Sequence, residues 1–542
     1  MKEYQKKALA IALALSSIGS TALAASSMSN DPGRLNKATT TEKKVDITVN
    51  QQNVDEQTGA AHFKLTKVNV KTKLHASQSA LEKITSKYVG RDITMTDLNA
   101  MTQSITKYLR THGYPAAAAY APEQRAVGGV LEIDVLPGKY GNIYINNKSK
   151  LLDSVVKTIT SPLKTGGYIT TNGLESVLYR LNDLGALKAT GTLSPGSEIG
   201  TSDLTIQLGD TKNERVILYA ENYGTKAAGR YRYGFLDDVY DVDHHGEHVS
   251  VFAMTSNDHL HNFGGTFELP YGRYATTLGV TASRSNYELG QKFKNEYDAQ
   301  GRSENVGIYA NTPLLRTTNH SQYFKFGADY HRLKDELRKF NYDTKRRSYS
   351  GHVGFEEQFR NGKNYTDYEI TTVYGNMDTV SDDAKAYGEY AAGQFTKGLL
   401  NVESVQAFDK HWDLLLKGQA QLASKDLDSS EQFYLGGANG VRAYGQGEAT
   451  GDKGYQYTGE LRYHTNAPGL TLSTYYDGGH VVFQKSAGLD TTLRGWGLGL
   501  TYTRPDDYFC RFDYARRIGL GDNLSNDARS SQRMWFIAGK IW

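Results

Sequence analysis

The sequence F-Y-L-G-G-A-N-G-V-R-A-Y, residues 433–444, is the stretch around which we interpret the rest of the chain. Its glycines, Gly436, Gly437 and Gly440, let the backbone take turns that are closed to other residues. Its one permanent cation is Arg442. The pattern predicts a loop hinged at the three glycines that carries an arginine near its tip. On composition alone, a surface hairpin with a solvated arginine is the simpler interpretation.

A second stretch, Y-Y-D-G-G-H-V at residues 475–481, places a carboxylate, Asp477, at the end of an alternating strand pattern. Counting from Leu470, the more apolar set of side chains runs through Leu472 to Tyr476, which leaves Asp477 on the opposite face. A charge within a strand is costly unless it faces a polar space or a cation. Asp477 is therefore predicted to face a polar interior.

Together the two stretches resemble the signature of the outer-membrane transporters of two-partner secretion, which belong to the superfamily of the barrel-assembly factors. In that family, a V-R-G-[YF] motif caps a long loop that folds back inside a β-barrel. An aromatic-x-D-x-G motif lies on the inner face of a later strand. The matching residues are Val441, Arg442, Ala443 and Tyr444 in the loop, and Tyr475, Asp477 and Gly479 on the strand.

The resemblance implies a lumenal loop at about residues 427–454, whose arginine, Arg442, meets Asp477 inside the barrel. A guanidinium can bond a carboxylate through two parallel donors, which a lysine cannot reproduce. The sequence departs from the family at Ala443, which replaces the usual glycine. A left-handed backbone at Ala443 would be strained, so we expect a differently shaped tip.

The N-terminus predicts export. Three early lysines, an apolar run at residues 8–15 and the A-L-A of residues 22–24 together indicate a signal peptide spanning residues 1–24. Beyond it, no run of about 18 apolar residues occurs, so a mature protein that spans a membrane must do so as a closed β-barrel. Residues 25–59 are predicted to be a polar linker. Many family members carry a plug helix at this end, but the weak helical periodicity here does not predict one.

Two similar modules are predicted at residues 60–138 and 139–211. In each, a strand is followed by two helices and a further strand, and the second helices end at Gly113 and Gly185, where a glycine can close a helix. This plan resembles the polypeptide-transport-associated (POTRA) domain, a β-α-α-β-β module that occurs twice before the barrel in the family. A pair of generic α/β domains is the alternative interpretation.

Residues 212–542 are predicted to form the transmembrane antiparallel barrel. In residues 495–502, aromatic and aliphatic side chains alternate with Gly or Thr, which is typical of strands with one lipid-facing side. Roughly 330 residues at about 20 per strand and connection allow about sixteen strands. Asp513 and Arg517 match a further family motif and share the lumen face with Arg511, although a polar barrel wall explains them equally well. The terminal Trp542 matches the aromatic residue that barrel-insertion machinery recognises in this superfamily.

Composition excludes several other classes of protein. The chain has 542 residues, a mean hydropathy of −0.55 and a net charge of +3, which gives no support to nucleic-acid binding. Its single cysteine, Cys510, excludes an intramolecular disulfide. The His-rich residues 243–248 have metal-ligand types but lie where a polar turn is expected. No catalytic constellation and no phosphate-binding loop is evident, so neither an enzyme nor a cofactor is predicted.

The leading functional hypothesis is an outer-membrane pore that secretes a large partner exoprotein, with its N-terminal domains in the periplasm. The resemblance implies a cargo of the adhesin, haemolysin or contact-dependent toxin type that carries an N-terminal secretion domain. The other expected partners are outer-membrane lipid and the barrel-assembly machinery. An outer-membrane assembly factor is the alternative, and a passive porin is the second alternative.

Overall fold

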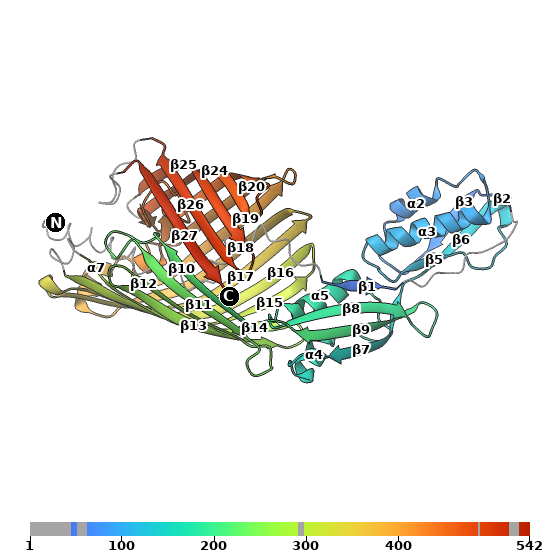
Figure 1. The fold of residues 1–542 in the computed structure, drawn as a ribbon, viewed down its shortest axis with the longest axis horizontal. Coiled ribbons are helices and arrows are strands. Elements are labelled where there is room, and N and C mark those ends of the chain that lie inside the picture. The colour runs from blue at the N-terminus through green and yellow to red at the C-terminus, as the bar shows by residue number, and fades with distance from the viewer. Residues whose placement is uncertain (1–44, 51–61, 291–297, 486–487, 520–529) are drawn as a thin grey trace.

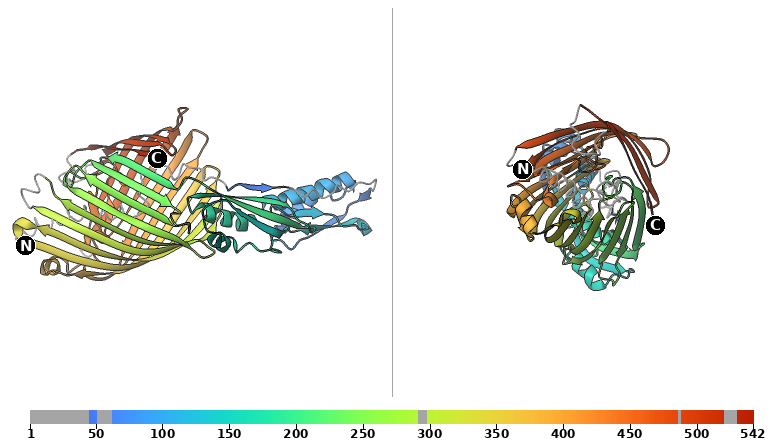
Figure 2. Two further views of the ribbon diagram at one scale, coloured as in Figure 1. Left: turned by 60° about the horizontal axis from the view of Figure 1, so that its bottom comes forward. Right: turned by 90° about the vertical axis from the view of Figure 1, so that its left-hand side faces the viewer.

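The computed structural model describes residues 45–50, 62–290, 298–485, 488–519 and 530–542. Figures 1 and 2 show a β-barrel with two small α/β modules that extend in line from one of its rims. The predicted signal peptide lies outside the described residues, and of the predicted linker at 25–59, where family members carry a plug helix, only residues 45–50 lie within them. We call the barrel rim that faces the modules the near rim and the opposite one the far rim.

The first module has a helical layer on a small sheet, with strand order β3-β6-β5. The longer helix begins with a capping box, in which the Thr94 side chain accepts a bond from the Asp97 amide and the Asp97 carboxylate accepts one from the Thr94 amide. The bond from the Thr94 amide lowers the pKa of the Asp97 carboxyl. The helix ends before Gly113, at φ 102°. The elements are β2 (Phe63–Lys64), β3 (Lys67–Lys71), α2 (Gln78–Thr85), β4 (Asp92–Ile93), α3 (Met95–Thr111), β5 (Ala118–Tyr120) and β6 (Val130–Leu136).

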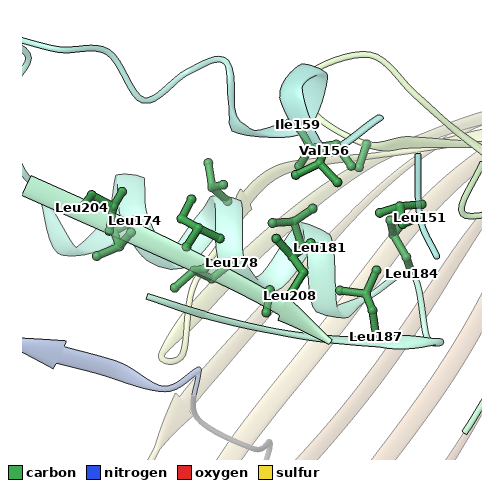
Figure 3. Close-up of a cluster of buried hydrophobic side chains, with 14 of the residues drawn as sticks. Leu151, Val156, Ile159, Leu174, Leu178, Leu181, Leu184, Leu187, Leu204 and Leu208 are labelled. Atoms are coloured by element: carbon green, nitrogen blue, oxygen red, sulfur yellow. The ribbon is translucent and has the colours of Figure 1, made fainter. Parts of the chain in front are cut away.

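The second module repeats the plan and packs its two helices on one face of the sheet (Figure 3). Leu174, Leu178 and Leu181 recur on one face of the longer helix and are fully buried. The sequence delimits one strand after this helix, whereas the structure has two. The elements are β7 (Lys139–Asn147), α4 (Asp153–Thr160), α5 (Thr171–Asn182), β8 (Leu187–Pro195) and β9 (Thr201–Asp210).

A strand lies within the segment predicted to be a linker. β1 (Ile47–Val49) pairs in parallel with β8, with Ile47 opposite Gly191, so the sheet order is β1-β8-β9-β7. Ile47 and Val49 pack against the core of the second module. The prediction of a plain linker is therefore wrong here, because a three-residue strand is too short to give a periodic signal in a polar sequence.

Sixteen antiparallel strands close the barrel, as the sequence predicted. The seam joins the first strand to the last, and Trp542 continues the pairing by exchanging backbone hydrogen bonds with Val216. The strands are β10 (Glu214–Glu221), β11 (Arg232–Tyr240), β12 (His248–Ser256), β13 (Leu260–Tyr271), β14 (Thr276–Glu288), β15 (Ala299–Arg316), β16 (His320–Leu337), β17 (Tyr342–Asn361), β18 (Asn364–Thr379), β19 (Gly393–Ala407), β20 (Trp412–Ala423), β23 (Lys453–His464), β24 (Leu470–Gln484), β25 (Leu489–Arg504), β26 (Tyr508–Arg517) and β27 (Gln532–Ile541).

The strands alternate between an exposed apolar face and an interior face. On β25, Trp496 and Leu498 are 39% and 53% exposed, whereas Gly495 and Gly497, each of which directly precedes one of them, are buried. At the far rim, a short helix, α7 (Asp382–Gly388), lies between β18 and β19. None of the helices in the described residues is long and apolar enough to cross a membrane.

The second module is docked on the near rim through polar contacts. Arg316, at the end of β15, donates Nε and Nη2 to the carboxylate of Asp183 at 2.8 and 3.0 Å. The His-rich turn takes part as well, because the His244 carbonyl accepts a bond from the Leu152 amide at 2.9 Å. Within the described residues, no group of three metal-ligating side chains is present. The turn thus contributes a backbone contact between module and barrel.

Candidate functional site

The candidate site lies at the tip of the loop that connects β20 to β23, which we call the lumenal loop (residues 424–452). Its base is a short hairpin, β21 (Phe433–Leu435) paired with β22 (Ala449–Gly451), preceded by a 3-10 turn, η5 (Ser429–Glu431). Directly after β21, Gly436 and Gly437 have φ values of 96° and 105°, in the left-handed region that favours glycine. These two residues redirect the chain towards its tip.

Gly440 contributes in a different way from the hinge that the sequence suggested. Its φ is not positive, but a Cβ atom there would lie 2.5 Å from Oε1 of Gln456. Gly479, on the barrel wall, has the same function, because a side chain there would collide with Leu435 of β21. Both glycines therefore allow the loop and the wall to approach each other closely.

The tip brings Arg442 against Asp477. Nε and Nη2 of Arg442 donate to the two carboxylate oxygens of Asp477, both at 2.8 Å, and the Arg442 amide donates to Asp477 Oδ2 at 3.1 Å. Thr458 donates a further bond to the same carboxylate at 2.9 Å. Arg442 and Asp477 are 5% and 1% exposed. The bidentate geometry is the one that only an arginine can supply.

Two further carboxylates complete the surroundings of Arg442. Its Nη1 donates to Glu460 on β23 at 2.9 Å and to Asp513 on β26 at 3.2 Å. A second arginine, Arg511, donates to both of these carboxylates at 2.7 to 3.2 Å. We call these five residues the Arg442 cluster. With two guanidinium groups and three carboxylates, each bonded to an opposite charge, the cluster can remain ionised away from water.

Sequence reasoning placed Asp513 and Arg511 in the lumen and Asp477 opposite Arg442, but it did not single out Glu460. Alternation on β23 carries the signal, because Tyr455 and Tyr457 are exposed and Glu460 has the opposite parity. The predicted lumen residue Arg517 lies beside the tip and not in the cluster. Its guanidinium stacks on Tyr444 at 4.5 Å, and its Nε donates to the Ala443 carbonyl at 3.4 Å.

Aromatic residues enclose the backbone and guanidinium of Arg442. The Cζ atom of Arg442 lies 3.2 Å from the ring centroid of Tyr475, a cation–π contact. Trp535 on β27 donates its indole N–H to the Arg442 carbonyl at 2.7 Å. Val441 and Tyr444, the first and last residues of the motif, are buried among apolar side chains. The tip is thus held by packing as well as by charge.

Ala443 does not have the left-handed backbone that would be strained at an alanine. It is absent from the residues with positive φ, so its side chain costs no backbone strain. Space for its methyl group comes from Gly495 on β25, where a Cβ atom would lie 2.5 Å from Ala443 Cβ. The alanine is tolerated because the barrel wall has a glycine opposite it.

The stem of the lumenal loop is fixed to another part of the wall. Nη1 of Arg346 on β17 donates to Asp428 at 2.5 Å. Lys397 on β19 donates to the Glu431 carboxylate at 2.7 Å, and Ser348 donates to the same side chain at 3.3 Å. Tip and stem are therefore held by two separate sets of strands, the tip by β23–β27 and the stem by β17–β19.

A sixteen-stranded barrel with two β-α-α-β-β modules at its near rim and an inward loop held by an Arg–Asp pair defines a translocator of the barrel-assembly-factor superfamily. The haemolysin secretion/activation protein family (ShlB/FhaC/HecB) matches residues 200–502, and the ShlB-type POTRA domain matches residues 63–138. Because the first match covers more than half of the chain, the protein belongs to this family of two-partner secretion transporters.

Individual relatives agree with this assignment. The chain is 27% identical over 482 residues to the heme/hemopexin transporter protein HuxB of Haemophilus influenzae (strain 86-028NP), covering 86% of this chain and 85% of that protein. It is 23% identical to the outer membrane transporter CdiB of Dickeya dadantii (strain 3937), covering 77% and 76%. Among solved structures, CdiB from Escherichia coli superposes with a TM-score of 0.71 at 19% identity, covering 94% and 95%.

The protein is therefore an outer-membrane translocation pore for a partner exoprotein, with its N-terminal domains in the periplasm. The near rim of the barrel is the periplasmic rim, and the far rim is extracellular. The relatives are transporters, and the lumenal loop with the Arg442 cluster occupies the interior of the pore.

Proposed function

We propose that the lumenal loop is the gate of this pore and that the Arg442 cluster holds the gate in its resting position. The observation that carries the proposal is that one loop residue bonds to carboxylates from three separate barrel strands, at Asp477, Glu460 and Asp513. A loop held in this way cannot move without leaving buried charges unpaired. The protein works as a passage for an adhesin, a haemolysin or a contact-dependent toxin and catalyses no reaction.

Conductance in planar bilayers tests the gate. The wild-type channel should be narrow and fluctuating, because the loop occupies the lumen. Deletion of residues 430–450, which removes the tip and leaves every barrel strand intact, should give a wider and steadier channel. An unchanged conductance after this deletion would mean that the loop does not limit the pore.

We further propose that an extended segment of the cargo's N-terminal secretion domain adds a strand to the sheet of the first module. In the second module, β1 already pairs with β8, so this sheet edge is occupied. In the first module, β3 is an outer strand in the order β3-β6-β5, and its five residues are long enough to pair with an incoming strand. Backbone bonds would supply affinity and alternate side chains would supply specificity.

Calorimetry on the complete protein in detergent tests this recognition. Deletion of residues 60–138 should abolish binding of the purified secretion domain. The matched control is deletion of residues 430–450, which changes the pore and leaves both modules intact. Equal affinity of the 60–138 deletion and the wild type would contradict recognition by the first module.

We also propose that export and assembly follow the features at the two ends of the chain. Residues 1–24 are removed as a signal peptide, and the exposed aromatic Trp542, paired at the barrel seam, is the residue that insertion machinery recognises. A Trp542→Ala variant should accumulate in the periplasm at normal synthesis levels. Normal insertion of that variant into the outer membrane would refute this role.

A further inference from the structure

A set of charged side chains lies on the outer face of the barrel near the extracellular rim. Its first row crosses five neighbouring strands, β14 to β18, and the residues in it are directly opposite one another in register. In order, they are Arg284, Glu304, Arg332, Arg347 and Asp378. The second row, two residues closer to the rim, contains Arg302, Lys334 and Lys345. We call them the cationic rows.

The side chains of the cationic rows point away from the lumen. On β15, Glu304 alternates in step with Val306 and Ile308, which are 49% and 58% exposed on the outer face. Asn305, between Glu304 and Val306, is buried. The side chain of Arg332 is 66% exposed and that of Arg347 is 47% exposed. The rows therefore lie on the surface that faces lipid or the lipid–water interface.

Like charges are directly opposite each other in both rows. Arg332 is in register with Arg347, and Lys334 is in register with both Arg302 and Lys345. Such pairs destabilise a sheet. A single carboxylate, Glu304, is the shared partner of three arginines at 3.7 to 4.0 Å, which are long contacts. The rows thus have an excess of positive charge on the side towards the membrane.

Carboxylates at the rim balance only part of this charge. Lys334 contacts Glu336, and Lys345 contacts Asp343 at 2.8 Å, both one step closer to the rim. Together with Glu304 and Asp378 these give four carboxylates against six cations. In the first row, Arg332 and Arg347 are adjacent, and among the described residues their carboxylate partners are Glu304 and Asp378, one for each arginine, which leaves room for an anionic group.

An apolar hollow lies on the same outer face, on the membrane side of these two arginines. It has a volume of about 550 Å³. Its depth comes from two small residues that are opposite each other, Ala328 and Gly351. Tyr330 and Tyr349, whose rings are 5.0 Å apart, separate the hollow from the cationic rows. The surface thus has an apolar site, a tyrosine boundary and a cationic site in sequence towards the extracellular side.

We propose that this surface binds a glycolipid of the outer leaflet whose headgroup carries phosphate groups. Its phosphates would lie between Arg332 and Arg347 and reach Lys334, because guanidinium groups bond phosphate through two parallel donors. Its acyl chain would occupy the hollow at Ala328 and Gly351. The bound phosphate would relieve the repulsion between the opposed cations. The strands of Arg332 and Arg347, β16 and β17, are separated by β18, β19 and β20 from β23, the nearest strand of the Arg442 cluster.

Native mass spectrometry of the complete protein in detergent micelles, titrated with bisphosphorylated lipid A, tests the proposal. The double variant Arg332→Gln/Arg347→Gln should bind lipid A about tenfold more weakly than the wild type, the loss expected for two charge-assisted contacts at an exposed site. The charge-matched control is Arg494→Gln/Arg516→Gln, two outward and exposed arginines on β25 and β26, which should bind as the wild type does. Equal weakening by both double variants would overturn the proposal.

Two further arms separate the headgroup from the acyl chain. Gly351→Phe fills the hollow without removing a charge. A side chain is tolerated at this position, because a Cβ atom added to Gly351 would have the Gly327 carbonyl oxygen as its nearest neighbour, 3.8 Å away. This variant should also weaken lipid A binding. Dephosphorylated lipid A should bind the wild type about tenfold more weakly. Full competition by millimolar inorganic phosphate, or equal binding of the dephosphorylated lipid, would contradict a glycolipid site.

Discussion

Arg442 has a role that depends on its geometry as well as its charge. Its guanidinium bonds Asp477 through two nitrogens and still has a third, Nη1, to donate to Glu460 and Asp513. A lysine ammonium has one nitrogen and cannot reach three carboxylates in this arrangement. Because all of these groups are buried, removal of any one leaves the others without full compensation.

We predict that Arg442→Ala and Asp477→Ala each abolish secretion while the barrel still inserts, and that Arg442→Lys is partly active. Loss of one partner of a buried, hydrogen-bonded pair costs about 3–5 kcal/mol, against about 0–1 kcal/mol for a pair in open solvent. Protection of the lumenal loop from protease reports the loss directly. In a double-mutant cycle, strictly additive effects would mean that the two residues do not interact.

A second prediction concerns Ala443 and Gly495. Gly495→Ala should loosen the tip, because the new methyl group would lie 2.5 Å from Ala443 Cβ. Adding Ala443→Gly should restore secretion and loop protection, since it removes the opposing methyl group. The single variant Ala443→Gly should remain active. If the double variant is as defective as Gly495→Ala alone, the contact between these two positions does not explain the defect.

Of the partners of Arg442, the sequence predicted Asp477 but did not single out Glu460. A motif and an alternating pattern are enough to place Asp477 in the lumen opposite the loop. Glu460 has the same parity signal on its strand, but no motif distinguishes it from other polar wall residues. The backbone at Gly440 and Ala443 could not be predicted, because φ there depends on how closely the loop approaches Gln456 and Gly495.

At the scale of elements, the lumenal loop is held to the barrel wall at two places, its tip and its stem. The tip is bonded to strands on the C-terminal side of the barrel, and the stem is bonded to β17 and β19 through Arg346–Asp428 and Lys397–Glu431. The sequence analysis located the loop but not these stem contacts, because their residues come from strands far away in the chain. The loop is therefore attached to two separate parts of the barrel wall by two sets of ion pairs.

We predict that tip and stem can be released separately. Arg346→Ala should increase fluctuations of the channel in planar bilayers and expose the stem to protease while the tip stays protected. Asp428→Ala should have the same effect, since it removes the other partner of the pair. The control is Arg347→Ala on the same strand, whose side chain points outward to Asp378. Equal effects of Arg346→Ala and Arg347→Ala would show that the stem contact is not responsible.

At the scale of the whole molecule, the position of the second module determines how a cargo would meet the periplasmic opening. The fold class could be predicted, because alternation and the repeated module plan are local features of the sequence, and the number of strands followed from the length of the barrel region. The docking of the module could not be predicted, since its contacts join α5 to the turn after β15, more than 130 residues later.

The docking contacts are an ion pair with supporting hydrogen bonds. The guanidinium of Arg316 bonds Asp183 through two nitrogens and stacks on Tyr179 at 4.4 Å. Nearby, the Thr318 amide donates to Glu175 at 2.9 Å. The side chain of Asp183 is 43% exposed, so solvent screens the pair. Its removal should cost only about 1 kcal/mol or less, which is too little to undock the module by itself.

Charge reversal separates this docking from general stability. Arg316→Asp places a second carboxylate opposite Asp183 and should release the module, whereas Arg316→Ala should have a small effect. Combining Arg316→Asp with Asp183→Arg restores an attractive pair and should restore docking.

The distance between the second module and the periplasmic rim can be measured with two spin labels. The labels are attached to cysteines introduced at Lys157 on the module and Lys363 on the rim, both exposed, in a Cys510→Ser background. A broad distance distribution is expected for Arg316→Asp and a narrow one for the wild type and the charge-reversed pair. The Arg442 cluster is untouched in all of these variants. A secretion defect that accompanies the broad distribution would therefore result from impaired delivery of the cargo at the periplasmic rim. A narrow distribution in Arg316→Asp would show that the ion pair does not hold the module.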